Sequence, residues 1–410
     1  MELLTNNEVE EVIKKLGYTK SLNWTLSEFS ETLLGYLSEH LTLTVEVLSA
    51  KCKTERIKLF IKCLPRFDEW KTRYIKELSF FQKEYVMLND LFRKIEQGTS
   101  KWRPRCLLVR EDLFVFEDVT ELGYQMPSAR STFELNQLKA CVISLAKFHA
   151  QSYIFEEKRS KELNRPYRIW DEYSEYLKHP ERCSSWRDAG RKAIIDYLKV
   201  YSKQKDNPKF ISNIESVITT LYDMALSLMK PSSKYRNTVV HLDLWANNIF
   251  LKKDSDGNTN AMFVDFQMVI YCSPMLDLSS LLYFNTNRGL RESYTGALLD
   301  LYYEKLSEEL SAAHINVNTI MDRVTFNECY KDSVIFAIIQ ASLSVPFVVM
   351  QSKTRDNILR EPDRHQTFYE VSRSKEFIEI ALQDDYYRYR VTDLFEEIVD
   401  RYVIQPDEYK

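Results

Sequence analysis

The order of apolar and polar residues divides the chain into a strand-rich beginning and a helical remainder. Residues 41–47 alternate between apolar and polar side chains, which is the period of a half-buried strand. A second apolar run at 57–64 follows a polar connection and ends at Pro65, so the two runs predict an antiparallel hairpin. Two more strands are predicted at 106–109 and 113–117. The chain therefore begins with the elements of a small antiparallel sheet.

Two helices are predicted in the same region. The first covers residues 6–17, and Gly17 ends it. The second follows the strand at 57–64: from Trp70 to Ile95, apolar residues recur at steps of three and four. This stripe predicts one long, uninterrupted helix between the second and third strands.

Beyond residue 119 the apolar spacing is that of helices. His149 lies on the apolar face of the first of them, which favours a packing residue of the core over a catalytic one. Further helical segments fill residues 155–235, and the charged residues 355–364 are interpreted as an exposed loop. The other helices are predicted at 135–150, 278–283, 294–310, 324–350 and 375–404.

A second hairpin, within residues 239–267, concentrates polar residues that strands seldom contain. Its sequence is VVHLDLWANNIFLKKDSDGNTNAMFVDFQ, in which short apolar strands at 248–251 and 261–264 flank a turn at 254–258. The Asp and Gly residues of that turn tolerate positive φ, which suits a tight connection. The unusual residues lie at the two ends of this hairpin.

His241, Asp243 and Asn248 precede the hairpin, and Asp265 follows it in an Asp-Phe dipeptide. This order and spacing is that of protein kinases, in which one Asp faces the acceptor hydroxyl while an Asn and a second Asp hold Mg²⁺. We therefore predict Asp243 as the catalytic base, Asn248 and Asp265 as metal ligands, and His241 as a brace of the loop. The alternative is a buried turn whose Asp and Asn side chains cap backbone N–H groups.

Residues upstream supply the other parts of a kinase-like site. Lys62, late in an apolar strand, is predicted to bind the nucleotide phosphates while paired with a helix glutamate, although a solvent-facing edge-strand lysine has the same pattern. Glu77 and Glu84 both border the stripe of the long helix, so periodicity does not choose between them. Backbone groups of Glu117 and Val119 are predicted to bind adenine at a hinge.

These elements predict an α+β fold of two lobes, like that of a protein kinase. The small antiparallel-sheet N-lobe covers residues 1–118, the hinge lies at 117–119, and the mainly helical C-lobe covers 119–410. Within the C-lobe, Asp277 lies twelve residues after Asp265 and just before an apolar segment. It is either a helix N-cap or a brace of the catalytic loop, and the sequence leaves both open.

The composition excludes several classes of protein. The 410 residues carry a formal charge of -4, with no basic block or motif for nucleic-acid binding. Seven scattered cysteines without a CxxC pair indicate reduced thiols of the cytoplasm, and the acidic N-terminus does not resemble a signal peptide. The uncharged run at 334–350 is shorter than the roughly 20 residues of a membrane span, so a buried helix is expected. No protein partner can be inferred.

The sequence resembles the ecdysteroid kinase-like family, a branch of the choline and aminoglycoside kinase group. The resemblance covers roughly residues 35–350, and its motifs stand in the order of the family. Trp245, and Gln267 in place of the kinase Gly, are more typical of this branch than of protein kinases. The motifs are FIKCLP (60–65), ELSFF (77–81), FVFEDVTELGY (114–124), LAKFHA (145–150), HLDLWANN (241–248), FVDFQ (263–267) and SPMLDL (273–278).

The resemblance implies that ATP and Mg²⁺ are used to phosphorylate a hydroxyl group on a small molecule. Ecdysteroids are one substrate class of the family, and hydroxylated foreign compounds are another. The family spacing between the helix glutamate and a paired aromatic favours Glu77 over Glu84. In two places the chain departs from the family: Leu242 replaces a usual Gly, and the nucleotide-covering loop near 35–41 has only one glycine.

Two other functions stay open at this point. One keeps the fold and changes the acceptor to a choline-like or aminoglycoside-like cation, which predicts an acidic acceptor pocket. The other is a catalytically idle kinase-like protein that binds nucleotide or ligand without phosphoryl transfer.

Overall fold

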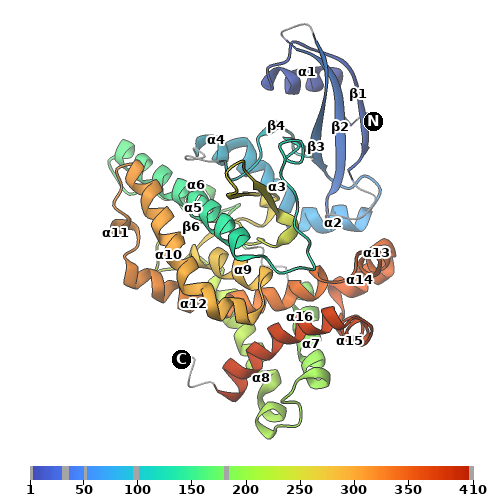
Figure 1. Cartoon of the computed structure of the whole chain (residues 1–410), viewed down its shortest axis with the longest axis vertical. Coiled ribbons are helices and arrows are strands. Elements are labelled where there is room, and N and C mark those ends of the chain that lie inside the picture. Colours follow the sequence, from blue (N-terminus) through green and yellow to red (C-terminus); the bar gives the residue numbers. More distant parts are fainter. Residues whose placement is uncertain (1–2, 30–36, 50–52, 96–100, 180–183, 406–410) are drawn as a thin grey trace.

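The chain folds into an upper, strand-rich lobe and a lower, helical lobe (Figure 1). The structure is a computed structural model that describes residues 3–29, 37–49, 53–95, 101–179 and 184–405. A five-stranded antiparallel sheet occupies the first lobe, and helices dominate the second. The predicted two-lobe α+β fold is confirmed.

The N-lobe sheet has the strand order β1-β2-β3-β5-β4. Helix α1 (Asn6–Lys15) packs against β1 and β4, and its first turn is held by a capping box between Thr5 and Glu8. Strand β1 was not among the predicted strands; it is an edge strand in which no residue is buried. The strands are β1 (Lys20–Glu28), β2 (Glu39–Leu48), β3 (Thr54–Cys63), β4 (Cys106–Val109) and β5 (Leu113–Glu117).

The prediction of one long helix between β3 and β4 is wrong. The chain breaks at Ser79, whose φ of 55° lies in the left-handed region. Beyond the break, Phe81 turns toward the sheet and stacks on Phe114 of β5, with ring centroids 4.4 Å apart. The segment consists of α2 (Glu69–Glu77), α3 (Phe80–Val86), the π-helical turn η1 (Met87–Leu91) and α4 (Phe92–Lys94).

The break also lets α2 reach the C-lobe. Trp70 packs edge-on against His365 and Tyr369 of α14 (Pro362–Glu370), with ring centroids 4.6 and 5.8 Å apart. Tyr74, one turn later, lies 6.2 Å from Tyr369. An aromatic contact therefore joins the two lobes at a point away from the hinge.

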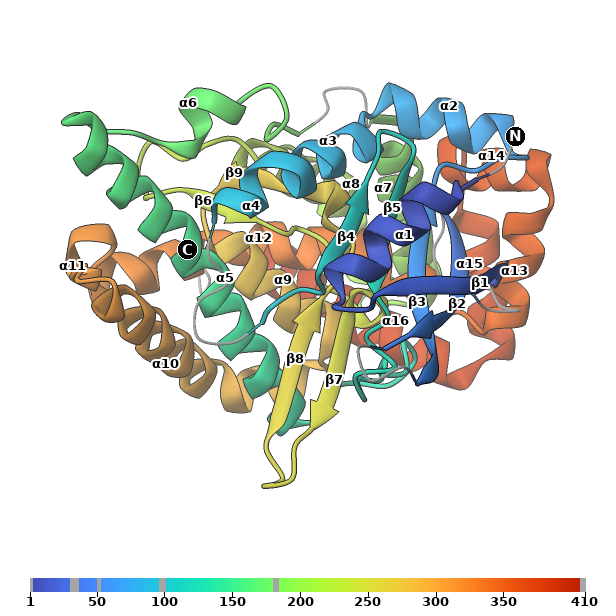
Figure 2. The same ribbon diagram turned by 90° about the horizontal axis from the view of Figure 1, so that it is seen from above.

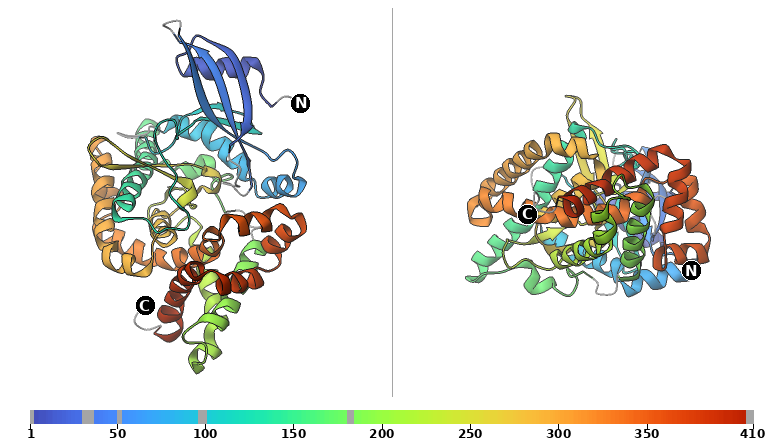
Figure 3. Two further views of the ribbon diagram at one scale, coloured as in Figure 1. Left: turned by 45° about the vertical axis from the view of Figure 1, so that its right-hand side comes forward. Right: turned by 90° about the horizontal axis from the view of Figure 1, so that it is seen from below.

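The C-lobe is built around α12 (Arg323–Val348), which packs against α8, α9 and α16. Helices α8 and α16 lie in the part of the molecule away from the N-lobe sheet (Figure 3). The other helices are α5 (Leu135–Leu163), α6 (Ile169–Tyr173), α7 (Ser184–Tyr201), α8 (Pro208–Leu228), α9 (Met275–Asn285), α10 (Arg288–Ala312), α11 (Val317–Ile320), α13 (Ser352–Arg360), α15 (Ser374–Gln383), α16 (Asp385–Ile398) and the π-helical η4 (Val399–Ile404).

Several predicted boundaries differ from these. Residues 355–364 are not a loop, because they belong to α13 and α14, and Ile358 and Leu359 are buried there. The single helix predicted at 375–404 is divided at Asp384 between α15 and α16. Within the described residues, α12 alone is long and apolar enough to cross a membrane, and 72% of its most apolar window is buried inside the protein. The helix predicted at 324–350 is thus a core helix.

Two small sheets in the C-lobe hold the polar hairpin. Strand β6 (Thr238–Val240) pairs with β9 (Ile270–Cys272), and β7 (Ile249–Lys253) pairs with β8 (Thr259–Phe263). The hairpin β7–β8 lies along α5 and projects outward (Figure 2). Pairing of β6 with β9 therefore brings the loop before the hairpin and the segment after it to the same place.

Candidate active site

The loop between β6 and β7 positions Asp243 through its own residues. Asn248 ends the short 3₁₀ turn η2 (Ala246–Asn248), and its Nδ2 donates to the backbone carbonyl of Asp243 at 2.9 Å and to Oδ2 at 2.8 Å. Trp245 Nε1 donates a longer bond of 3.3 Å to the same carboxylate oxygen. The half-buried carboxylate is therefore held in one orientation, as a general base requires.

His241 connects this loop to the end of β8. Its Nε2 lies 2.9 Å from the carbonyl of Val264, and its Nδ1 lies 3.3 Å from the backbone nitrogen of Asp243. Because a carbonyl only accepts and an N–H only donates, the proton resides on Nε2. Burial lowers the pKa of His241, so the ring is neutral. The structure gives His241 the bracing position predicted for it.

Asp277, in the first turn of α9, holds the backbone of the catalytic loop. Its carboxylate accepts from the N–H groups of His241 and Leu242, both at 2.6 Å, and from Nε2 of His149 at 3.1 Å. It does not cap its helix, because Pro274 occupies the N-cap position without a side-chain bond. Of the two interpretations of Asp277, the brace is the one the structure contains, and His149 is the buried core residue predicted.

Asp265 meets Lys62 across the cleft between the lobes. Lys62 Nζ donates to Asp265 Oδ1 at 2.8 Å and to Glu84 Oε2 at 2.5 Å. The other oxygen of Glu84 accepts from the N–H of Phe266 at 3.1 Å. Only 4% of the Lys62 side chain and 1% of that of Glu84 are exposed, so the lysine is not a solvent-facing edge residue. This ion-pair cluster joins β3, α3 and the end of β8.

The prediction that Glu77 pairs with Lys62 is wrong. Glu77 is the last residue of α2 and is exposed, whereas Glu84 lies in α3 and makes the bond. The break at Ser79 separates the two glutamates, so that only the helix after the break faces β3. The position beside Lys62 that was predicted for Glu77 is therefore occupied by Glu84.

The charges of the site act on one another. Burial alone would raise the pKa of Asp265, but the adjacent Lys62 ammonium outweighs it and holds that pKa below its ordinary value. Burial alone would lower the pKa of Lys62, but the negative charges of Asp265 and Glu84 outweigh burial and raise that pKa, so the lysine stays charged. Burial raises the pKa of Asp243 to about 7, and the negative charge of Asp265 acts in the same direction. Asp243 therefore titrates well above an ordinary aspartate.

A cavity between the lobes is lined by Lys62, Glu84, Asp243, Asn248 and Asp265. One end of it is apolar and faces the hinge. Phe60, Phe116 and Phe250 line that end together with Val119. The Val119 carbonyl accepts from the N–H of Tyr124 at 3.1 Å, whereas its own N–H has no partner in the part of the chain that the structure describes. An aromatic slot beside a free backbone donor suits the flat, polar-edged base of a nucleotide.

Glu117 also lines the cavity at the hinge. Its N–H donates to the carbonyl of Arg105 at 3.1 Å, and its carboxylate is paired with the guanidinium of Arg105 at 3.3 Å. Of the two predicted hinge residues, Val119 is thus the one with an N–H available to a ligand.

The oxygen atoms near Asp243 fit a hard divalent cation such as Mg²⁺. The Nδ2 of Asn248 is engaged by Asp243, which leaves the amide oxygen as a donor to a metal. One oxygen of Asp265 is bound by Lys62, and the other is left for the same use. Magnesium is commonly held by one or two protein oxygens together with substrate phosphates, so this small donor set is sufficient. Across the described residues, no group of three or more His, Cys, Asp or Glu offers another metal site.

The opposite end of the cavity, which we call the acceptor end, is built mainly by C-lobe helices. It is rich in aromatic rings and contains two buried arginines, and among the described residues the C-lobe helices that line it contribute no carboxylate to the cavity. Its walls include Tyr74 of α2, Trp186 and Arg187 of α7, Phe368 and Tyr369 of α14, and Arg373 at the start of α15.

Comparison with protein families decides the classification. The profile of the ecdysteroid kinase-like family matches residues 33–315, which is more than half of the chain. The chain belongs to the ecdysteroid kinase-like family. Membership of this family supports a general activity, phosphoryl transfer to a small molecule. No curated protein matches the sequence.

Solved structures that resemble this ecdysteroid kinase-like protein do so loosely. An ethanolamine kinase of Plasmodium vivax has 11% identity and a TM-score of 0.44, with 97% of this chain and 86% of that chain covered. A microcompartment-associated aminopropanol kinase has 12% identity and a TM-score of 0.44, with 97% and 98% covered. At these scores the likeness says nothing about mechanism or substrate.

Sequence reasoning identified no individual residue of the acceptor end of this ecdysteroid kinase-like protein. Trp186, Tyr369 and Arg373 stand in segments without a motif, and only their shared cavity brings them together. Of the nucleotide-covering loop predicted near 35–41, residues 35 and 36 lie outside the described residues, and residues 39–41 belong to β2. Leu37 and His40, at its described end, line the cavity.

Proposed function

We propose that the protein uses ATP and Mg²⁺ to phosphorylate a hydroxyl group of a small molecule, with an ecdysteroid or a hydroxylated xenobiotic as the acceptor. One observation carries the proposal: Asp243, Asn248, Asp265 and Lys62 surround a single cavity whose hinge end suits a nucleotide base. These residues come from both lobes and from positions about 200 residues apart, so a chance turn of polar residues does not explain them.

Asp243 is the proposed base that orients the acceptor hydroxyl and receives its proton. Asn248 and Trp245 fix the carboxylate, and its raised pKa of about 7 brings it close to the pH of the cell, where a base works best. Such a base typically contributes about 10²–10⁴-fold to the rate.

Lys62 is proposed to bind nucleotide phosphates, with Glu84 holding its ammonium group in place. Asn248 and Asp265 would hold Mg²⁺, which when bound supplies positive charge against the phosphate oxygens. Val119 would donate its N–H to the base. The five described cysteines are free thiols, which supports the cytoplasm as the place of reaction.

The acceptor end favours this proposal over a kinase of choline-like or aminoglycoside-like cations. A site for such a cation needs carboxylates away from the reacting hydroxyl, whereas the buried charged residues here are Arg187 and Arg373. The aromatic rings suit an apolar acceptor with ring systems.

The test measures ADP release with Mg-ATP across ecdysteroids, plant phenolic glycosides, choline and aminoglycosides. We expect release above background with at least one apolar alcohol, and loss of at least about 10²-fold of that rate in Asp243→Asn. Asp256→Asn, in the exposed hairpin turn, is the matched control and should retain the rate. If no acceptor raises ADP release above that of Asp243→Asn, the protein is an idle binding protein. Hydrolysis of ATP without an acceptor would not count as transfer.

A further inference from the structure

Arg373 occupies an unusual position at the acceptor end of the cavity. Its side chain is 1% exposed, and it stacks on Trp186 and Phe368, with the guanidinium carbon 4.5 and 5.4 Å from the ring centroids. Nε donates to the carbonyl of Phe368 at 3.1 Å, and Nη2 donates to that of Trp186 at 2.7 Å. Two neutral carbonyls and two rings therefore hold a cation inside the protein.

The positive charge of Arg373 is not balanced by a carboxylate within the described residues. Burial lowers its pKa to about 10, which still leaves the group charged at neutral pH. Its Nη1 has no hydrogen-bond partner among the residues that the structure describes, and Arg373 lines the cavity. A buried charge without an opposite charge is costly, so a partner from outside the chain would stabilise it.

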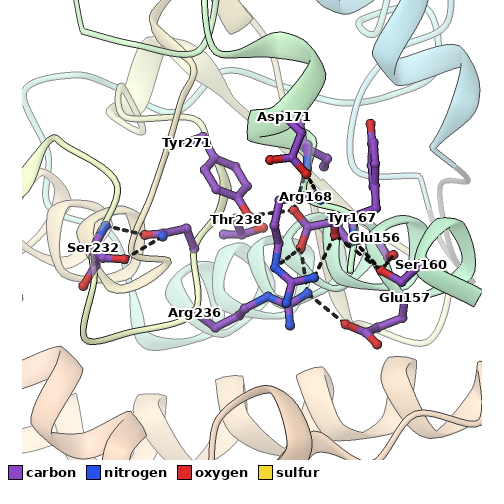
Figure 4. A network of polar contacts seen from close by, with 12 residues as sticks. Glu156, Glu157, Ser160, Tyr167, Arg168, Asp171, Ser232, Arg236, Thr238 and Tyr271 are labelled. Carbon is purple, nitrogen blue, oxygen red and sulfur yellow. Dashed lines mark hydrogen bonds and ion pairs between the residues drawn. The ribbon is translucent and has the colours of Figure 1, made fainter. Parts of the chain in front are cut away.

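Two other arginines of the C-lobe have such a partner. The half-buried Arg236 is bound to the fully buried Glu156 in the polar network shown in Figure 4, at 2.7 Å. The buried Arg291 is bound in the same way to Glu397. Neither of these two arginines lines the cavity.

Arg373 is also placed to act together with Asp243. Tyr369 lies within electrostatic range of both, because burial raises its pKa while the Arg373 guanidinium opposes and the Asp243 carboxylate adds to that shift. The guanidinium carbon of Arg373 lies 6.0 Å from the centre of the Tyr369 ring, and all three residues line the same cavity. A ligand with its hydroxyl at Asp243 would extend past Tyr369 toward Arg373.

We propose that the acceptor end binds a ring-bearing apolar alcohol that also carries an anionic oxygen group, and that Arg373 recognises this group through Nη1. The inference rests on the proposed function for the identity of the hydroxyl end. The aromatic rings of Trp186 and Tyr369 bind the ring system, and the carboxylate or sulfate of the ligand neutralises the buried guanidinium.

The test uses binding alone, measured by titration calorimetry on the full chain without nucleotide. The probes are an aryl alcohol and a steroid alcohol, each in three forms that carry a carboxylate, its methyl ester or a methyl group. We expect the carboxylate form of at least one scaffold to bind about tenfold tighter than the methyl form, with the ester close to the methyl form. Arg373→Met should reduce the affinity of the carboxylate form to within about twofold of the methyl form.

Arg390→Met is the matched control, because Arg390 is buried and donates to the carbonyl of Thr286 but does not line the cavity. Arg390→Met should keep the preference for the carboxylate.

Three outcomes would overturn the inference. They are equal binding of the carboxylate and methyl forms, equal binding of the carboxylate and ester forms, and an equal loss of affinity for all three forms in Arg373→Met. The ranking on the unaltered protein decides the matter even if Arg373→Met does not fold. Preferential binding without ADP release would contradict the proposed function and leave this inference standing.

Discussion

The carboxylate of Asp277 holds the backbone of Leu242 in a conformation that leucine rarely adopts. Leu242 has a φ of 69°, in the left-handed region, and its N–H donates to Asp277 Oδ1 at 2.6 Å. That conformation costs a non-glycine residue about 1–2 kcal/mol, whereas a hydrogen bond to a charged group contributes about 1.5–3 kcal/mol. Asp277 therefore offsets the backbone strain at Leu242.

Asp277→Asn should impair turnover by displacing Asp243. An asparagine would direct an NH₂ group at one of the two backbone N–H groups that Asp277 now accepts from. We expect kcat to fall by about 10²-fold while KM for ATP stays within about twofold, because the nucleotide groups lie elsewhere. Steady-state kinetics with the acceptor found in the substrate panel would check this.

Asp322→Asn, at the N-cap of α12, is the control and should be nearly neutral, since Asn caps as well as Asp. A rise in KM for ATP without loss of kcat would contradict the positioning of Asp243 by Asp277.

Glycine at position 242 should be tolerated better than alanine. Both Leu242→Gly and Leu242→Ala remove a fully buried side chain, at a cost of about 2–5 kcal/mol, but only glycine relieves the positive φ. We expect the glycine variant to be more stable than the alanine variant by about 1 kcal/mol. Leu244, also fully buried and without a positive φ, should show the reverse order. Thermal unfolding of the four variants measures both differences. If glycine and alanine ranked in the same order of stability at the two positions, the backbone of Leu242 would not be strained.

Glu84→Gln and Glu77→Gln separate the two candidate partners of Lys62. Glu84→Gln removes a buried charge from the lysine, so KM for ATP should rise by about tenfold. Glu77→Gln changes an exposed residue and should leave KM within about twofold. If Glu77→Gln alone raised KM for ATP, the pairing seen in the structure would not be the functional one.

Glu397 should make stability depend on pH in the acid range. It accepts from Tyr283 Oη at 2.8 Å and is paired with Arg291 and with Arg401, the latter at 2.8 Å. Burial alone would raise the pKa of Glu397, but the two guanidinium groups outweigh it and hold that pKa below its ordinary value. A carboxylate with a lowered folded-state pKa stabilises the protein above its unfolded pKa of about 4.3, and the contribution is lost as pH falls through the folded value.

Glu397→Gln should therefore lower the stability by about 3–5 kcal/mol at pH 7, because it leaves two arginines without their buried partner. It should also weaken the fall in Tm below about pH 4.3. Thermal unfolding as a function of pH measures both effects, with the exposed Glu292→Gln as control. An unchanged Tm at pH 7 would show that the network adds no stability.

Gly190 of α7 is required by close packing near Arg373. A Cβ there would clash with Leu343 Cδ2 and lie 3.2 Å from Arg373 Nη1, so Gly190→Ala should destabilise the protein by about 1–3 kcal/mol. Gly296 lies inside α10 with open space around it, so Gly296→Ala should instead stabilise by about 0.5–1 kcal/mol. Denaturant unfolding of the two variants tests this opposite sign.

Parts of the site that lie close together in sequence were predictable. Asp243, Asn248 and Asp265 belong to one hairpin, and the residue spacing fixes which ends of the strands they occupy. Lys62 was predictable because few apolar strands contain a buried cation. Asp277 could not be decided, since an N-cap and a brace place the same residue type at the same position.

Glu84 could not be chosen because its selection depends on tertiary packing. Residues seven apart lie on the same face of a continuous helix, so Glu77 and Glu84 are equivalent by periodicity. The break at Ser79 involves neither Gly nor Pro, and the stacking of Phe81 on Phe114 accompanies it. Strand β1 was predictable, because Leu22, Trp24 and Leu26 alternate with polar residues in the strand Lys20–Glu28.

The contact of Trp70 with His365 and Tyr369 limits how the lobes can move. The chain itself connects them at 117–119, and this aromatic contact connects them a second time. The ion pair of Lys62 with Asp265 connects them a third time, inside the cavity. Three separated connections leave two rigid bodies no free rotation, so any movement of one lobe against the other must stretch or break one of these contacts.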